Sequence, residues 1–397
     1  MGRDMTRREM LSVAALALAG GPALARPPRP LVRPVAGLDR RLVSSGRLAW
    51  RGIDAGFLPE MEALGVQFYS GGAPVDVLRL AAAAGVNLLR IRVWVDPPSG
   101  YCGTAQALAL AARAHAVGMR VLLNFHLSDS WADPGQQMVP AAWAALSGAA
   151  LAQRVREYTR DVTAALRDQG TPPAFVQVGN EVTDGVLWPH GRISVAGWGS
   201  FAALFSAGTA GVLDALPGVG PGPGADRPRF LLHIDRGGDN AVSRWFYDNA
   251  VQAGILFDVV ALSYYPWWHG GLEAMGTNVA DMAARYGRPV WLVETAYPWT
   301  LSWNDDTFNF VGSVGQLQPG FGASPAGQSA FVQRLIDTLA RVPNGLGQGL
   351  CYWAPEYTGV PGVFGSPWEN LALFDFDRRM LPALVRLGAG VCPAVDR

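Results

Sequence analysis

The sequence predicts a single α/β domain folded as a (β/α)8 TIM barrel. Eight short β-type runs recur along the chain, separated mostly by alanine-rich segments with the spacing of amphipathic helices. Strand and helix alternating eight times is typical of this fold. The alternative, an open doubly wound sheet, would require a glycine-rich phosphate turn after an early strand, and the sequence has none. Half of the 397 residues are hydrophobic, so the chain can bury a large core.

The predicted strands are short and rich in β-branched, leucine and aromatic residues. The helical pattern between them is clearest in VDVLRLAAAAGV and AQALALAARAHAVGM. Their Ala-Gly-Val and Val-Gly-Met endings are typical of helix C-caps that lead into the next strand. In chain order, the predicted strands are Leu48 to Asp54, Val86 to Trp94, Arg120 to His126, Phe175 to Glu181, Arg229 to Asp235, Val259 to Tyr265, Pro289 to Glu294 and Gly349 to Trp353.

Polar and aromatic side chains collect at the ends of these runs. In a barrel, active sites lie at the C-terminal ends of the strands, so we expect these side chains around one mouth. The long segments after the third, fourth, seventh and eighth strands would form its walls. The residues at the strand ends are Asp54, His126, Asn180, Glu181, His233, Asp235, Tyr264, Tyr265, Glu294 and Trp353.

Two glutamates are the candidates for catalysis. Glu181 follows Asn180 in the run AFVQVGNE, and Glu294 ends the apolar run PVWLVE. Hydrolysis of a glycosidic bond requires two carboxyl groups, because one protonates the leaving oxygen while the other attacks or supports the anomeric carbon. Both runs are surrounded by Trp, Tyr, His and Asn, the side chains that stack on sugars and hydrogen-bond to them.

Two arginines and three cysteines complete the candidate set. Arg90 and Arg92 share one face of the second strand, and a buried arginine must be paired, so we favour Arg90 for the site. Among Cys102, Cys351 and Cys392 one intrachain disulfide at most can form. Neither the cysteines nor the five histidines have the spacing of metal ligands, so we expect no metal site of this type.

The N-terminus is similar to a twin-arginine export signal. Arg7 and Arg8 precede an apolar stretch at 11–20, which is too short to span a bilayer, and Ala23-Leu24-Ala25 offers a cleavage site. We therefore expect an exported protein, periplasmic or secreted, without a stable membrane anchor.

The expected domain organisation follows from that signal. Residues 1–25 would be the export signal, 26–46 a linker rich in Pro and Arg, and 47–397 the barrel domain. The net charge of zero, without a basic patch, argues against nucleic acid as a partner. Nothing in the sequence demands more than a monomer.

Seven runs resemble glycoside hydrolase family 53, the arabinogalactan endo-β-1,4-galactanases. They cover nearly all of the chain after residue 46 and are far more specific than one Asn-Glu pair. The resemblance implies a retaining endo-hydrolase of β-1,4-galactan, the side chain of type I arabinogalactan, that requires no cofactor. The runs are RGIDAG (51–56), LLRIRVWVDP (88–97), NFHLSDSWADPGQQ (124–137), VQVGNEVTDGVLWPHG (176–191), LSYYPWWHG (262–270), VETAYPWT (293–300) and WENLALFDFD (368–377).

The resemblance also implies roles for single residues. Glu181 would be the general acid/base, with Asn180 reaching the sugar 2-hydroxyl. Glu294 would be the nucleophile, held ionised by Arg90. Other residues would shape the subsite of the reacting sugar or lie in the cleft: His126, Tyr264 or Tyr265, Trp353, Asp54, Asp129, Trp131 and His233. Further tryptophans after the strands are expected to stack on galactose in about half of the cases: Trp188, Trp267, Trp268 and Trp299.

Two segments depart from the family pattern. Asn124-Phe125-His126-Leu127 stands where the family shows Asp-Phe-His-Tyr. Tyr352-Trp353-Ala354-Pro355-Glu356-Tyr357 replaces Tyr-Trp-Glu-Pro-Ala-Trp, so a glutamate has moved. Some bacterial members hold calcium near the segment Asn304-Asp305-Asp306; a solvated turn is favoured here, with calcium as the alternative.

Two other functions stay open. The chain could be a retaining glycosidase of the same clan that acts on mannan, glucan or xylan, because the catalytic pair is shared across the clan. It could also be a non-catalytic polysaccharide-binding barrel, although both glutamates are present. The assignment of galactan as the substrate depends on the family-specific runs around 129–133 and 265–267.

Overall fold

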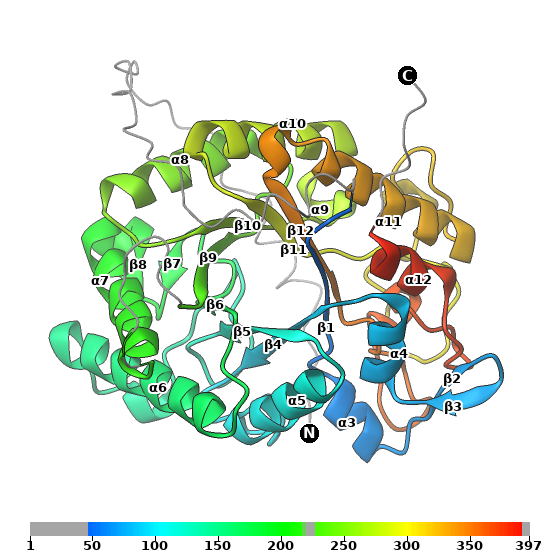
Figure 1. The fold of residues 1–397 in the computed structure, drawn as a ribbon, viewed down its shortest axis with the longest axis horizontal. Helices are drawn as coiled ribbons and strands as arrows, with labels where there is room; N and C mark the ends of the chain where they lie inside the picture. Colours follow the sequence, from blue (N-terminus) through cyan, green and yellow to red (C-terminus); the bar gives the residue numbers. More distant parts are fainter. Residues whose placement is uncertain (1–46, 217, 219–226, 391–397) are drawn as a thin grey trace. The chain divides into compact units, whose positions relative to one another are not determined.

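The computed structural model describes residues 47–216, 218 and 227–390. Parallel strands close into a barrel in the order β1-β12-β11-β10-β9-β6-β5-β4, and helices surround it (Figure 1). The predicted (β/α)8 barrel is confirmed. Its strands are β1 (Trp50–Asp54), β4 (Leu88–Val93), β5 (Arg120–Phe125), β6 (Phe175–Val178), β9 (Arg229–Ile234), β10 (Val259–Ser263), β11 (Val290–Glu294) and β12 (Gly347–Trp353).

Every predicted strand exists, but one end was predicted wrongly. Strand β6 stops at Val178 rather than at Glu181. The backbone leaves the extended conformation there, because Gly179 adopts a φ of +87° and Glu181 a φ of +49°. The other predicted bounds either coincide with the observed ones or differ from them by at most two residues.

The helices follow the strands and cover the outside of the barrel. Asp76 caps α4 by accepting the backbone N–H of Arg79 at 2.7 Å, and Gly85 ends it at a φ of +103°. Gly118 follows α5 at a φ of +78°, so both predicted glycine ends are confirmed. The helices are α3 (Leu58–Ala63), α4 (Val77–Ala84), α5 (Thr104–Ala116), α6 (Gly148–Asp168), α7 (Ile193–Asp214), α8 (Asn240–Gln252), α9 (Pro266–His269), α10 (Leu272–Tyr286), α11 (Pro325–Ala340) and α12 (Pro382–Ala389).

Helix α7 is the one helix of the described residues whose length and composition would allow it to cross a membrane. In this fold it packs against α6 and β6. Phe201 and Phe205 on its inner side are buried in the core.

The interior of the barrel changes from apolar to polar along the strands. Leu88, Leu122 and Leu231 belong to an apolar cluster that fills the lower barrel together with Trp291 and Cys351. Because side chains alternate along a strand, the next inward positions carry Arg90 and Arg92 on β4, Asn124 on β5 and His233 on β9. These polar residues are buried. The apolar floor therefore supports a polar layer at the C-terminal end of the barrel.

The barrel closes by pairing its first strand with its last. Strand β1 pairs with β12 in register from Trp50–Gly349 to Asp54–Trp353. Outside the sheet, the backbone N–H of Leu48 donates to the carbonyl of Gly390 at 2.9 Å. Helix α12 packs against α4 and α11 and so completes the helical ring.

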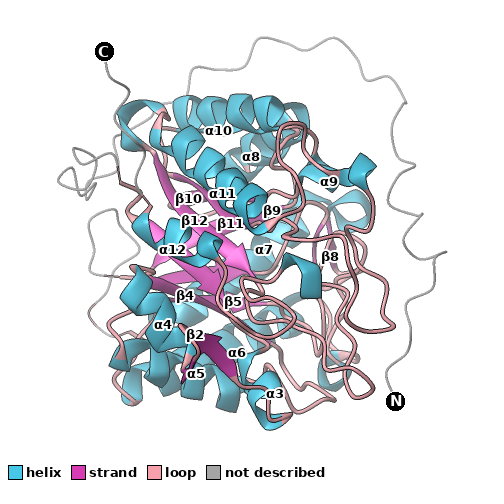
Figure 2. Cartoon of the chain, turned by 90° about the vertical axis from the view of Figure 1, so that its right-hand side faces the viewer, coloured by secondary structure: helices cyan, strands magenta, loops and turns pink. Residues whose placement is uncertain are grey.

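The connections that follow the strands gather at one end of the barrel (Figure 2). They include α9 after β10 and a short hairpin after β6, formed by β7 (Gly185–Val186) and β8 (Gly191–Arg192). A second hairpin, β2 (Phe68–Ser70) with β3 (Ala73–Val75), lies between α3 and α4 in the chain.

Three predicted features lie outside the described residues: the export signal, the linker and Cys392. Cys102 and Cys351 are free and buried.

Candidate active site

A buried arginine organises the mouth of the barrel. Arg90, 1% exposed, donates from Nε to Gln177 Oε1 at 2.8 Å and from Nη1 to Asp54 Oδ2 at 2.7 Å. Its Nη2 donates to Asn180 Oδ1 at 2.7 Å and to Glu294 Oε1 at 2.8 Å. A buried guanidinium is tolerated only when it is paired in this way, so four neighbouring groups are held in fixed positions around Arg90.

Glu294 ends β11 and is 6% exposed. Burial raises the pKa of Glu294, whereas the positive charge of Arg90 opposes that shift. Tyr265 donates its hydroxyl to the second oxygen, Oε2, at 3.2 Å. Both oxygens therefore have donors, and the ionised form of Glu294 is stabilised.

Glu181 lies in a different electrostatic environment. It is partly exposed, and its Oε1 accepts the Ser263 hydroxyl at 2.5 Å. Burial of the carboxyl group and the negative charges of Glu294 and Asp235 raise the pKa of Glu181 well above its usual value. No ion pair to Glu181 is found among the described residues. The two glutamates therefore differ in their surroundings: Glu294 is paired with a cation, whereas Glu181 is not, and the pKa of Glu181 is raised further.

The two carboxyl groups are close enough for a double displacement. An oxygen of Glu181, an oxygen of Glu294 and a ring nitrogen of His233 lie within 4.8 Å of one another. Carboxyl groups about 5 to 5.5 Å apart are typical of glycosidases that retain configuration, whereas inverting enzymes need a wider gap for water.

The same three side chains do not fit a metal centre. His233 Nδ1 accepts the backbone N–H of Glu181 at 3.3 Å, and its Nε2 is 2.9 Å from Ser263 Oγ. A metal ligand needs a ring nitrogen with a free lone pair, and both nitrogens of His233 are engaged.

His126 is held as a neutral imidazole. It is 3% exposed, and its Nδ1 accepts the backbone N–H of Ala132 at 3.2 Å. Burial, with the positive charges of Arg90 and Arg92, holds the pKa of His126 well below its usual value. The remaining proton therefore lies on Nε2, which can donate to a hydroxyl group.

Aromatic rings form a wall beside these groups. Trp353 and Trp131 are partly exposed, with ring centroids 6.0 Å apart. Trp368, which the sequence analysis did not select, meets Trp353 edge to face at 4.5 Å. Phe57 contacts both Trp131 and Trp353, at 5.9 and 5.8 Å. Flat, partly exposed rings of this kind suit the apolar face of a pyranose.

Four predicted substrate-binding residues have other contacts. Asp54 is fully buried between Arg90 and Arg92. Both carboxylate oxygens of Asp129 accept backbone N–H groups, from Asp96 and from Ala141.

The side chains of Tyr264 and Trp188 make their contacts elsewhere, although the backbone N–H of Tyr264 donates to the carbonyl of Glu294 at 2.8 Å. Tyr264 is fully buried, stacks against Phe331 and donates to the carbonyl of Gly270, so Tyr265 is the tyrosine of the site. The Arg192 guanidinium lies 4.0 Å over the ring of Trp188 and covers one of its faces.

Sequence reasoning missed Gln177 and Ser263. Both lie inside quoted runs, VQVGNE and LSYYPWW, and both point inward by strand alternation. That alternation was the available signal. Their partners, Arg90 and Glu181, come from other strands, so the hydrogen bonds could not be read from one run.

The displaced glutamate of the last strand is buried behind the aromatic wall. Glu356 is fully buried, and its Oε1 accepts the backbone N–H of Phe57 at 2.9 Å. Among the described residues, neither Oε2 of Glu356 nor Nη2 of Arg92 has a hydrogen-bond partner. Burial raises the pKa of Glu356 to about 8. Arg92 instead lies 4.1 Å over the ring of Phe57 and pairs with Asp54 at 3.3 Å.

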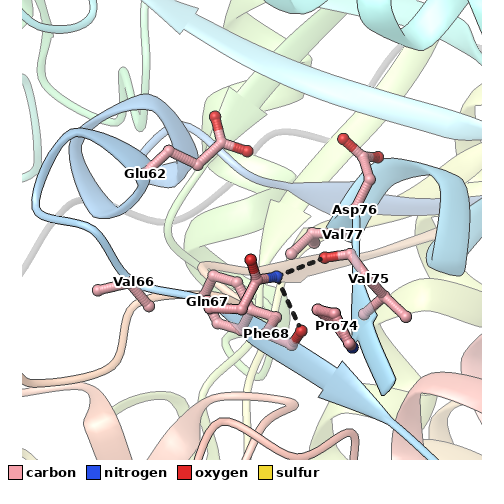
Figure 3. Close-up of a pocket in the computed structure, with 8 residues that line it drawn as sticks. All are labelled: Glu62, Val66, Gln67, Phe68, Pro74, Val75, Asp76 and Val77. Carbon is pink, nitrogen blue, oxygen red and sulfur yellow. Dashed lines mark hydrogen bonds between the residues drawn. The ribbon is translucent and has the colours of Figure 1, made fainter.

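A pocket of about 370 Å³ lies away from this chemistry, between α3 and the β2–β3 hairpin (Figure 3). Gln67 donates across it to the carbonyls of Phe68 and Val75. Its two carboxylates, Glu62 and Asp76, are both bound by Arg113. The pocket therefore has no free carboxylate for catalysis.

Comparison with known proteins gives one consistent family. The model of Glycosyl hydrolase family 53 matches residues 50–387. An uncharacterized protein in the bgaB 5′ region of Niallia circulans is 40% identical over 86% of this chain and 93% of its own length. An arabinogalactan endo-beta-1,4-galactanase of Cellvibrio japonicus is 34% identical over 84% of this chain and 89% of its own.

Solved structures agree with that match. The GH53 catalytic domain of Ignisphaera aggregans superposes with a TM-score of 0.80 at 33% identity, covering 92% of this chain and all of that domain.

The buried Glu356 leads to a prediction about stability and pH. Unfolding lets Glu356 return to an ordinary pKa near 4.5, whereas the folded value is about 8. The contribution of protonated Glu356 to the free energy of unfolding is fully present below pH 4.5 and is lost as pH rises through 8. The total loss is a few kcal/mol. Glu356→Gln keeps the acceptor for Phe57 but cannot ionise. We expect the melting temperature of this variant to fall less than that of the wild type between pH 5 and pH 9.

The matched control is Glu273→Gln, because Glu273 is exposed on α10. Its pH dependence should follow the wild type. An equal loss of melting temperature in Glu356→Gln and wild type would contradict a protonated Glu356.

Proposed function

The chain belongs to Glycosyl hydrolase family 53, and we propose that it cuts internal β-1,4-galactosidic bonds of galactan with retention of configuration. One observation carries the mechanism. Two carboxyl groups, one paired with a buried arginine and one without a cationic partner among the described residues, have oxygens within 4.8 Å of each other at the mouth of the barrel.

Glu294 acts as the nucleophile. Its charge is stabilised by Arg90 at 2.8 Å and by the Tyr265 hydroxyl at 3.2 Å. It attacks the anomeric carbon as the glycosidic bond breaks and forms a covalent glycosyl-enzyme. Arg90 also binds Asn180, so nucleophile and amide are oriented by the same cation.

Glu181 acts as the general acid and then as the general base. It protonates the leaving oxygen in the first step and removes a proton from the attacking water in the second. Once Glu294 is esterified, its negative charge is gone, so one of the influences that raise the pKa of Glu181 disappears. Glu181 can then accept the proton from water.

The substrate class comes from the relatives. The Cellvibrio japonicus and Aspergillus niger relatives carry the name arabinogalactan endo-beta-1,4-galactanase. The partly exposed Trp131 and Trp353 suit stacking on a pyranose, a feature that galactan shares with mannan, glucan and xylan. A binding protein without activity would have no need for two neighbouring carboxyl groups of which one, Glu294, is paired with an arginine and the other, Glu181, has a strongly raised pKa.

Replacing the nucleophile should abolish hydrolysis. Glu294→Gln keeps the size of the side chain but removes its charge, so we expect a loss of at least about 10³-fold in kcat on β-1,4-galactan. Reducing-sugar release is measured with mannan, xylan, β-glucan and β-1,3-galactan alongside. Proton NMR of the first products of the wild type should show the β-anomer at the new reducing end.

Glu273→Gln serves again as the matched control and should keep full activity, because that side chain is exposed on an outer helix. Activity of the wild type on another glycan would retain the mechanism but replace the substrate. Equal baselines in wild type and Glu294→Gln would favour the binding protein.

We also propose a calcium site between the connections that follow β11 and β12. Asp305 accepts backbone N–H groups from Thr307 and Ser366. Glu369 is fully buried, and within the described part of the chain its Oε2 has no hydrogen-bond partner. A Cβ at Gly359 would lie 2.1 Å from an oxygen of Asp305 and 2.7 Å from Glu369 Oε2, so both oxygens face the same small space. Oxygen ligands of this kind suit calcium.

The test is thermal. Calcium should raise the melting temperature of chelator-treated protein by a few degrees through binding to the folded state, and Glu369→Gln should remove that increase. Equal melting with calcium and with chelator would mean that the pair is held without a cation. Burial and the charge of Asp305 already raise the pKa of Glu369 to about 7. In that case a proton shared between Glu369 and Asp305 takes the place of the cation.

We propose export by the twin-arginine route, with cleavage after Ala25. Arg7 and Arg8, the short apolar stretch and the small-residue cleavage site support it. In a bacterial host, mass spectrometry of the exported protein should find residue 26 as its N-terminus. Changing Arg7 and Arg8 together to Lys should retain the protein in the cytoplasm, and unchanged export would contradict this route.

A further inference from the structure

A ring of hydrogen bonds starts and ends on Glu181. The backbone N–H of Glu181 donates to His233 Nδ1 at 3.3 Å. His233 Nε2 lies 2.9 Å from Ser263 Oγ, and Ser263 Oγ lies 2.5 Å from Glu181 Oε1. His233 is 1% exposed and Ser263 is fully buried, so water does not compete for these contacts.

The donor and acceptor of every hydrogen bond in this ring follow from the bond between the backbone N–H of Glu181 and His233 Nδ1. A backbone N–H can only donate, so Nδ1 of His233 must be the unprotonated nitrogen. The neutral ring then carries its proton on Nε2 and donates it to Ser263 Oγ. Burial and the positive charge of Arg90 keep the pKa of His233 well below its usual value, which agrees with a neutral ring.

The hydrogen bond from His233 determines that Ser263 donates its hydroxyl hydrogen to the carboxyl group of Glu181. Its oxygen already accepts from His233, so its own hydrogen is free to donate to Glu181 Oε1. If Oε1 carried the acid proton and donated to Ser263, the serine hydrogen would be buried without an acceptor among the described residues. Such an arrangement is disfavoured, so Oε1 accepts and the acid proton belongs on Oε2.

We propose that Ser263 and His233 are positioning residues that determine which oxygen of Glu181 carries the transferable proton. This inference rests on the proposed function. Oε2 gives its proton to the glycosidic oxygen as the bond to the anomeric carbon breaks and Glu294 bonds to that carbon. In the second step, Oε2 takes a proton from the water that displaces Glu294. Ser263 and His233 keep their protons throughout.

The backbone supports the same arrangement. Val182 N–H donates to the carbonyl of His233 at 2.8 Å, so Glu181 and its neighbour are both fastened to one residue of β9. Glu181 holds a φ of +49°, a conformation that non-glycine residues adopt only when neighbouring contacts impose it. Ser263 is the last residue of β10, the strand that pairs with β9.

The leaving group distinguishes proton positioning from a structural role. We expect Ser263→Ala to lower kcat/KM on galactan about 10- to 100-fold, since proton donation to a sugar leaving group is weakened. The same variant should lose less than about 3-fold on 2,4-dinitrophenyl β-galactobioside, because that group leaves without an acid. The ratio kcat/KM reports only the steps up to the first irreversible one. The role of Glu181 as a base in the second step therefore does not affect this comparison.

Three further variants give controls. Ser263→Thr keeps the hydroxyl group and should restore most activity on galactan. Ser243→Ala removes a different fully buried serine, which also makes two hydrogen bonds, and should leave both substrates unaffected. His233→Gln added to Ser263→Ala should produce little additional loss, because both changes break one ring.

Equal losses on the two substrates would overturn the proposal and assign Ser263 a structural role. Unchanged activity on galactan would overturn it as well. If the wild type does not cleave galactan, the proposed substrate fails, and phenyl and dinitrophenyl β-glycosides of the accepted sugar give the same comparison. A selective loss on the phenyl compound would then still support positioning by Ser263.

Discussion

The pairing of one buried cation with the carboxylates around it determines the arrangement of the barrel mouth. Arg90 contacts Asp54, Gln177, Asn180 and Glu294, which come from three other strands or their ends. A guanidinium without these partners could not remain in the interior. The partners are equally dependent, since Asp54 and Glu294 are buried carboxylates. Stability of the barrel and orientation of the nucleophile therefore rely on the same contacts.

The fold could be predicted from sequence because the barrel repeats one unit. Each strand is a short apolar run, and each connection contains a helical pattern, so the architecture did not depend on any single boundary. The end of β6 could not be predicted. Val178 is followed by Gly179 and Glu181 in left-handed conformations, and this turn is held by hydrogen bonds to other strands: Gly179 donates to Phe125, and Glu181 donates to His233.

Site residues could be predicted where the alternation of side chains along a strand determines which of them point into the barrel. Alternation places Arg90 inward, and it selects Tyr265 over Tyr264 once the inward face of β10 is known. It does not reveal cross-strand partners, so the Ser263 hydroxyl and the Gln177 amide were missed. Roles that depend on loops were also unpredictable: Asp129 holds two backbone N–H groups, a use that no local pattern indicates.

The closure of β1 on β12 has a consequence for how the chain acquires its structure. The two strands stand near opposite ends of the barrel domain, and α12 must also dock on α4. Such long-range pairing carries a high loop-closure entropy and forms late. Until β12 arrives, β1 presents an open sheet edge that can pair with other chains. A chain cut short before Gly347 could not close, so C-terminal truncation should yield aggregates rather than a smaller active enzyme.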